Sequence, residues 1–272
     1  MVKRLLLLLI LLGPKFLLAQ SYEKEYVTLF AWEVKQIDEF VERFDNSDST
    51  LIKQYNQKHD PSRPLTREKL IKSLFNAERK DWNFSDITTF IKQVDNKDNP
   101  VYLDFYNGNW YANVNCAVVW KGKPLSAMFK LKIEKLANGG YKWVITDVDA
   151  KFLSKKNANG VTQAIDQPVL PKPENKNAAL NPMSHAIDFL NIDKVSDNSK
   201  NIGNYLATSD KYSDELCVFI NECINNRLKI INVKNITYSC SQVKGWSIEI
   251  KQYNRQTKNS GWLISKLKKV SS

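Results

Sequence analysis

Apolar residues recur at three- and four-residue steps near the start of the chain and predict an amphipathic helix over residues 27–44. A shorter helix is expected to begin near Leu51. A third helix is predicted over residues 66–80, because Leu65 and Leu70 have the spacing of a hydrophobic staple. Each of these helices has one apolar face, which must be buried.

After Trp82 the apolar period changes from helical to alternating, which predicts antiparallel strands. Residues 101–106 and 109–120 alternate on either side of Asn107-Gly108, and Asn-Gly is the strongest short signal for a hairpin. A two-residue loop there places all apolar partners on one face of the sheet, whereas a slip by one residue would scramble them.

Two further turns extend these strands into a meander. Residues 121–124 are predicted to form a four-residue loop that pairs Trp120 with Leu125. Residues 137–140 then turn into a strand that contains Trp143 and Ile145. The sequence thus predicts an antiparallel sheet with one apolar face, which the three N-terminal helices are expected to cover.

A proline-rich segment, residues 154–182, separates this half from the rest and is expected to be an extended tether. We therefore predict an α+β domain over residues 21–153 and a second, shorter α+β domain over residues 183–272. A shift of 119 residues without gaps places Trp143 on Trp262, so we expect the two domains to be related by internal duplication.

The first twenty residues, 1–20, have the order of a secretory signal peptide: basic residues, an apolar run, and small and polar residues before Ser21. The uninterrupted apolar run, Leu5 to Leu12, is far shorter than the roughly 20 residues of a membrane span. No cysteine near the cleavage region offers a lipid anchor. We expect an exported protein, periplasmic or extracellular, with no lipid anchor and no transmembrane span. An uncleaved N-terminal anchor is the alternative.

The formal net charge of the chain is +11, and removal of Lys3, Arg4 and Lys15 with the signal peptide lowers it to +8. Residues 227–272 hold ten basic residues and one acidic residue. In an exported protein this excess favours anionic lipids, polysaccharides or acidic proteins as partners over nucleic acid. The candidate anion-binding residues are Lys251, Arg255, Lys258, Lys266 and Lys268. The alternative is a solvated basic face without a partner.

Catalytic chemistry has few candidates. The sequence contains no HExxH, P-loop, GxSxG or CxxC motif, so no metal or cofactor is expected. Asp147 follows Trp143 and Ile145 at even steps and is expected to point to the apolar face, where burial would raise its pKa and suit a general base. His59, beside Asp60 in a polar segment, is the second candidate.

Polar strand positions supply a candidate contact surface. Tyr102, Tyr106, Tyr111 and Asn113 are expected to share the polar face of the first hairpin, where they would suit contact with a glycan or a protein. A solvated strand face has the same pattern. The cysteines leave two alternatives open, a disulfide to Cys240 in the second half or free thiols throughout.

Helices followed by a long antiparallel meander resemble the NTF2-like superfamily, the α+β cone of nuclear transport factor 2 and ketosteroid isomerase. The segments DEFVERFDNSDS, GNWYANVNCAVVWKG and YKWVITDVDA in particular resemble two-lobed NTF2-like secreted bacterial proteins of unknown function. The resemblance covers residues 22–153 and, more loosely, residues 183–270. It implies a pocket between the helices and the concave face of the sheet, which some members use for catalysis.

We therefore expect an exported, non-catalytic binding or assembly module of the cell envelope. One alternative is a small-molecule isomerase or dehydratase that uses Asp147 as its base. Another is adhesion to anionic envelope polymers through the basic C-terminal sheet. The expected partner is an envelope protein, a glycan or an anionic polymer, and a homodimer stays open.

Overall fold

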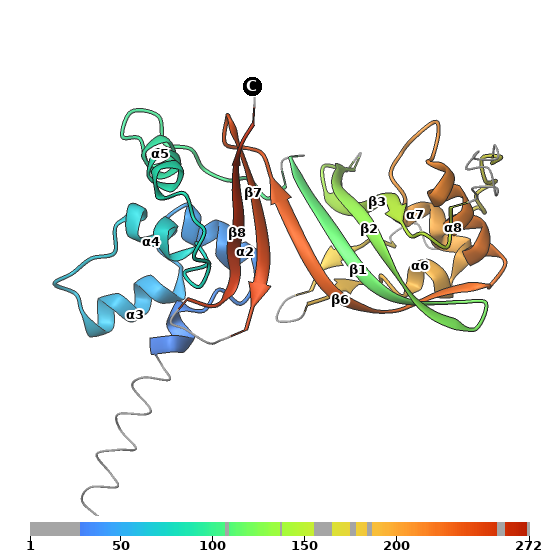
Figure 1. The fold of residues 1–272 in the computed structure, drawn as a ribbon, viewed down its shortest axis with the longest axis horizontal. Helices are drawn as coiled ribbons and strands as arrows, with labels where there is room; N and C mark the ends of the chain where they lie inside the picture. Colours follow the sequence, from blue (N-terminus) through green and yellow to red (C-terminus); the bar gives the residue numbers. More distant parts are fainter. Residues whose placement is uncertain are drawn as a thin grey trace, which may run out of the picture. The chain divides into compact units, whose positions relative to one another are not determined.

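The computed structural model describes residues 28–106, 109–136, 138–154, 165–174, 178–183, 187–254 and 259–270 (Figure 1). The chain forms two compact units. Unit 1 is made of residues up to Tyr102 together with Gln252–Leu263, and unit 2 is made of Leu103–Lys251 and the residues from Ile264 onward. The predicted signal peptide, residues 1–20, lies outside the described residues. Within the described ranges, every helix is too short or too polar to cross a membrane.

Four helices form most of unit 1: α2 (Ile37–Phe44), α3 (Leu51–His59), α4 (Arg67–Ser73) and α5 (Phe84–Val94). The side chain of Thr66 caps α4 by accepting the Lys69 N–H, and the side chain of Asn83 caps α5. The predicted helices near Leu51 and from Thr66 are confirmed, although α4 ends at Ser73 and not near residue 80. The sequence analysis missed α5.

The predicted helix over residues 27–44 is interrupted at Val34. The N–H of Val34 donates to the carbonyl of Ser260 at 2.9 Å, and its carbonyl accepts the N–H of Trp262 at 2.8 Å. Arg43, only 3% exposed, donates to the carbonyls of Trp32 and Glu33 beside the interruption. Pairing with a distant strand therefore overrides the helical periodicity of the sequence.

Arg67 joins three segments of unit 1. Its guanidinium donates to the carbonyl of Phe44 at 3.1 Å, to that of Val94 at 2.9 Å and to that of Val101. The same group lies 4.5 Å from the ring centre of Tyr102. Phe44 and Val94 are the last residues of α2 and α5, so one buried cation satisfies carbonyls that the helix ends leave without partners.

Six strands form one curved, mostly antiparallel sheet in the order β3-β2-β1-β6-β7-β8 (Figure 1). Their bounds are β1 (Trp110–Trp120), β2 (Lys123–Lys135), β3 (Tyr141–Asp149), β6 (Leu228–Cys240), β7 (Trp246–Tyr253) and β8 (Gly261–Lys269). The residues of β7 and β8 are divided between the two units. Short strands β4 (Asn181–Pro182) and β5 (Phe189–Leu190) pair separately. The predicted α+β class with an antiparallel sheet is confirmed at this level.

The shift of 119 residues that motivated the predicted duplication also relates the strands of the two halves. Adding 119 to the bounds of β1, 110 and 120, gives 229 and 239, which lie inside β6. The same shift places β3, residues 141–149, on residues 260–268 and so on β8. Each half therefore contributes a three-stranded meander, and the first strands of the two meanders pair with each other.

The apolar face of the first meander is covered by elements of the second half of the chain. These elements are α6 (Lys194–Asp197), the short 3₁₀ helix η1 (Ser199–Asn201), α7 (Ile202–Tyr205) and α8 (Asp214–Ile224). Phe219 of α8 contacts Phe129 of β2 edge to face, with ring centres 5.1 Å apart. The expectation that the N-terminal helices cover this face is therefore wrong: those helices lie in unit 1 with residues 252–263.

The compact units do not follow the predicted division into residues 21–153 and 183–272, since unit 2 contains strands from both ranges. Part of the predicted tether is packed. Leu180 is fully buried, and its carbonyl accepts the N–H of Trp143 on β3 at 3.0 Å. Unpaired backbone groups at the edge of β3 explain why this part of the segment is not extended into solvent.

Two details of the predicted hairpins differ from the structure. Residues 101–106 form no strand, because β6 occupies the position beside β1, and Asn107-Gly108 lies outside the described residues. The next loop has two residues, so Trp120 pairs with Lys123. Lys121 and Gly122 both have positive φ, as a tight hairpin turn requires. The observed pairing of β1 with β2 differs from the predicted pairing by two residues. Because this shift is even, every side chain stays on its predicted face of the sheet.

Gly261 should be indispensable to unit 1. A Cβ atom added there would lie 1.9 Å from the carbonyl oxygen of Val34, and the residue has a φ of +83°. We expect Gly261→Ala to destabilise the protein by about 3 kcal/mol or more, measured by denaturant unfolding. Gly122→Ala is the matched control, because Gly122 also has positive φ but nothing lies within 4 Å of its added Cβ. Equal losses in the two variants would contradict a steric role for Gly261.

Candidate functional site

Asp147 does not share the apolar face of β3. Leu131 of β2 pairs with Ile145 of β3, and Lys130, the residue before Leu131, pairs with Asp147. Thr146 is therefore an extra residue in a β-bulge. The bulge reverses the alternation and brings Val148 to the buried face opposite Phe129. The predicted orientation of Asp147 is therefore wrong, because sequence parity does not include the extra residue.

The carboxylate of Asp147 is held by three donors. It accepts the ammonium of Lys130 at 2.9 Å, the hydroxyl of Ser213 at 2.7 Å and the N–H of Val148 at 2.9 Å. Burial raises the pKa of Asp147, but the hydrogen bonds from Lys130 and Ser213 outweigh it and lower the pKa below its ordinary value. Ser213 also caps α8, so Asp147 fixes the start of that helix to β3. A group with this environment is a poor general base near neutral pH.

His59 is the last residue of α3 and is exposed. Its ring lies 4.4 Å from the ring of Tyr55, one helical turn earlier. Asp60 caps the helix through its backbone, and the structure places no hydrogen bond between the two side chains. His59 therefore lies outside any catalytic arrangement of the described residues.

The predicted tyrosine surface is only partly assembled. Tyr102 belongs to unit 1 and lies over the guanidinium of Arg67. Tyr106 belongs to unit 2 but lies outside the sheet, where its ring contacts that of Tyr141 at 5.5 Å. Tyr111 and Asn113 do lie on one exposed face of β1, as predicted.

That face of the sheet also carries part of the predicted basic cluster. Asn113 pairs with Lys130 on one side and with Thr237 on the other, and Thr237 pairs with Lys251. Side chains of directly paired residues point to the same face. Four strands, β2, β1, β6 and β7, thus present a row of polar side chains on the face opposite the core. We call this surface, with the adjacent row through Tyr111, the open sheet face.

The remaining predicted cations extend the open sheet face or lie outside the described part. Lys266 on β8 approaches Glu249 of β7 at 3.6 Å, and Glu249 lies in the row of Tyr111 through Ser239. Lys268 follows two residues later and is exposed. Arg255 and Lys258 lie outside the described residues.

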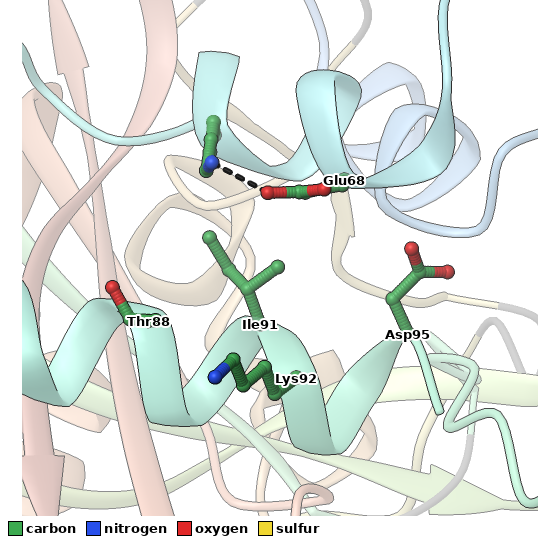
Figure 2. A pocket seen from close by; sticks show the side chains of 6 residues that line it. Glu68, Thr88, Ile91, Lys92 and Asp95 are labelled. Carbon is green, nitrogen blue, oxygen red and sulfur yellow. Dashed lines mark hydrogen bonds and ion pairs between the residues drawn. The ribbon is translucent and has the colours of Figure 1, made fainter. Parts of the chain in front are cut away.

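A second candidate site is a groove between α4 and α5 in unit 1. Its polar part has a volume of about 240 Å³. Figure 2 shows side chains that line this part. Glu68 accepts the ammonium of Lys72 along α4, and the side chain of Ile91 points from α5 toward α4. The hydrogen bond from Lys72 lowers the pKa of Glu68. Lys92 and Asp95 complete this part on α5.

The other part of the groove is apolar and has a volume of about 410 Å³. Its walls include Phe75, Trp82, Phe84 and Ile87. Phe75 and Trp82 meet edge to face at 5.3 Å, whereas Phe84 is 72% exposed. Lys72 and Thr88 line both parts of the groove, so the two parts adjoin each other.

The groove was not predicted from the sequence, because helix α5 was not predicted. Its signal was present: Asn83 is a typical N-cap, and Ile87, Phe90, Ile91 and Val94 have helical spacing.

The four cysteines are free thiols buried in unit 2. Burial raises the pKa of Cys116 and that of Cys240 to about 12, and raises the pKa of Cys223 as well. A disulfide to Cys240 is therefore not formed, and these thiols are unreactive at neutral pH. In the described ranges, His, Cys, Asp and Glu side chains form no group of three that could hold a metal ion.

Comparison of the chain with protein-family models, with curated proteins and with solved structures finds no match.

The environment of Asp147 predicts how the protein responds to acid. A lowered pKa means that Asp147 contributes stability above its unfolded pKa of about 3.9, and that this contribution is lost as the pH falls through the folded value. We expect Asp147→Asn to lower the unfolding free energy at pH 7 by less than about 1 kcal/mol, because the pair is partly exposed. The difference between the variant and the parent should shrink as the pH is lowered below about 3.9. An NMR titration that gives Asp147 a raised pKa would contradict the stabilising role of its hydrogen bonds and would favour its role as a general base.

Proposed function

We propose that the protein is an exported, non-catalytic binding module, and that the open sheet face of unit 2 binds a linear anionic polymer such as an acidic polysaccharide. The observation that carries the proposal is the register that brings Asn113, Thr237 and Lys251 into one row opposite the core, with Asn113 and Lys251 exposed. Asn113 and Lys251, two candidate ligand residues from distant parts of the sequence, thus lie in the same row of the sheet.

The chemistry of the open sheet face suits an extended polyanion. Amide and hydroxyl groups of Asn113, Asn115 and Thr237 can donate to ring and hydroxyl oxygens along a chain. Tyr111 is 47% exposed and offers a flat ring with a polar tip. A long, solvated sheet face contacts a polymer along its length more readily than it encloses a small molecule.

Charge supports an anionic ligand. Lys130 and Lys266 are engaged by Asp147 and Glu249. Among the described residues, Lys251 and Lys268 are exposed and have no acidic side chain within ion-pairing distance. Unit 2 therefore keeps cations on this face that are available to an external partner.

The alternative function, an isomerase or dehydratase with Asp147 as its base, has less support. Asp147 points away from the core and has a lowered pKa. It also accepts a hydrogen bond from Ser213, the N-cap residue of α8. The NTF2-like assignment stays a proposal, supported by helices together with a curved, mostly antiparallel sheet. Export rests on the sequence of residues 1–20.

A binding measurement with defined polymers tests the proposal. We expect a polyuronate of about ten sugars to bind the full chain, and a neutral glucan of equal length to bind far less. Lys251→Gln combined with Lys268→Gln should weaken polyuronate binding by about 2- to 30-fold, since each exposed ion pair contributes about 0.2–1 kcal/mol. Raising the salt from 10 to 150 mM should weaken it further, because the screening length falls from about 30 to about 8 Å.

The matched control is Lys80→Gln combined with Lys97→Gln, which removes two exposed charges from unit 1. This control should bind like the parent. Equal losses in the two double variants would show a response to net charge alone, and equal binding of the neutral glucan would remove the anionic ligand. Either result would contradict the proposal.

Export has its own test. When the full chain is produced in a bacterium, we expect the mature protein to begin at Ser21 and to be recovered from the periplasm or the medium. Mass spectrometry of the purified protein and fractionation of the cells measure both. A chain that retains residues 1–20 in the membrane fraction would support the uncleaved anchor instead.

A further inference from the structure

Helix α5 has two faces with separate environments. Phe90, Ile91 and Val94 are buried in unit 1 and account for its packing. Phe84, Thr88 and Lys92 follow each other at four-residue steps and line the α4–α5 groove. The packing of unit 1 does not require the residues of this second stripe, since all three are exposed.

The apolar end of the groove is a preformed aromatic wall. The indole N–H of Trp82 donates to the carbonyl of Asn76 at 2.7 Å, which fixes the orientation of the ring. The edge-to-face contact with Phe75 holds it from the other side. Phe84 has no ring partner among the described aromatic residues. An exposed phenylalanine beside fixed rings is typical of a contact site for an aromatic or aliphatic side chain.

The charges along the groove are paired, with one exception among the described residues that line it. Arg79 is held by both carboxylate oxygens of Asp81, at 2.6 and 2.8 Å. Lys72 is bound to Glu68, and Asp95 lies 3.9 Å from the guanidinium of Arg67. Lys92 has no such partner within the described ranges and is exposed at the polar end (Figure 2). The polar end therefore complements an anion.

The distance between Phe84 and Lys92 sets the spacing of the side chains that a bound peptide can use. Phe84 and Lys92 are eight residues apart on one helix, which corresponds to about 12 Å along its axis. An extended peptide advances about 3.3 Å per residue, so the same distance separates side chains three or four positions apart. The groove is open to solvent along Glu68, Lys72, Thr88 and Lys92, and so it admits a continuous chain.

From this arrangement we propose that the α4–α5 groove of unit 1 binds a short acidic peptide segment of a partner protein. An aromatic side chain of the segment occupies the wall formed by Phe75, Trp82 and Phe84. A carboxylate three to four residues further along pairs with Lys92. The groove shares no residue with the open sheet face, so peptide binding is tested independently of polymer binding.

NMR titration of the full, isotope-labelled chain with a defined peptide tests this. The probe is a terminally blocked octapeptide with tryptophan at its second position and aspartates at its fifth and sixth. We expect saturable shifts of the Trp82 indole N–H and of the α5 amides, with a Kd of roughly 0.1–1 mM. Replacing the aspartates by asparagine, or the tryptophan by alanine, should weaken binding at least about fivefold.

Variants of the protein make the test specific. Phe84→Ser should weaken binding at least about tenfold without loss of the native spectrum, because the ring is mostly exposed. Lys92→Glu should weaken it at least about fivefold, and a peptide with lysines in place of the aspartates should recover binding to this variant. Lys97→Glu is the charge control and should bind the original peptide like the parent chain.

Three outcomes would overturn the proposal. The first is no saturable shift up to 5 mM peptide. The second is shifts that do not centre on Trp82 and α5, or an affinity that Lys92→Glu leaves unchanged. The third is saturable binding of dodecanoate to this groove together with absence of peptide binding, which would identify a lipid as the occupant.

Discussion

Without the ladder between β1 and β6, each of the two meanders would expose a long unpaired strand edge. The ladder runs from Trp110 opposite Cys240 to Trp120 opposite Leu228, and two register shifts interrupt it. It joins residues more than a hundred positions apart, so neither half of the sequence can complete the sheet alone. Edge strands with free N–H and C=O groups are templates for aggregation. Pairing the first strands of the two meanders removes both of these edges at once and places the two apolar faces on the same side of one sheet.

The outer edges, β3 and β8, are closed in a related way. Ile145 of β3 forms a parallel bridge with Leu206, and Gly261 of β8 forms a parallel bridge with Val34. In each case a segment next to the helices of one half pairs with the last strand of the other half. Gly261 permits this at β8, because the carbonyl of Val34 occupies the space that a Cβ atom would need. The close approach explains why a glycine stands at a strand position that other residues would fill with a side chain.

Much of the local structure could be predicted from the sequence, because it depends on periodicity. The buried faces of β1, β2 and β3 up to Ile145 follow directly from alternation, and even the wrong loop length at residues 121–124 did not disturb them. Long-range choices could not be predicted in this way. Nothing local indicates that Val34 leaves its helix to pair with Gly261, or that β6 takes the place expected for residues 101–106. The bulge at Thr146 had the largest effect on the candidate site, since one extra residue turned Asp147 from the core to the surface.

The distribution of partners among charged groups separates structural from functional candidates. Arg43 and Arg67 are buried, and each is bound to backbone carbonyls. Glu222 accepts the indole N–H of Trp120 at 2.7 Å and the guanidinium of Arg227 at 2.7 Å, and these bonds outweigh its burial and lower its pKa. A buried charge must be paired in this way, because an unpaired one would cost several kcal/mol. Exposed charges carry no such requirement, so their lack of an internal partner costs nothing and leaves them available to a ligand. Lys251 on the open sheet face and Lys92 in the α4–α5 groove are in that position, each beside exposed aromatic or amide groups that the core does not use.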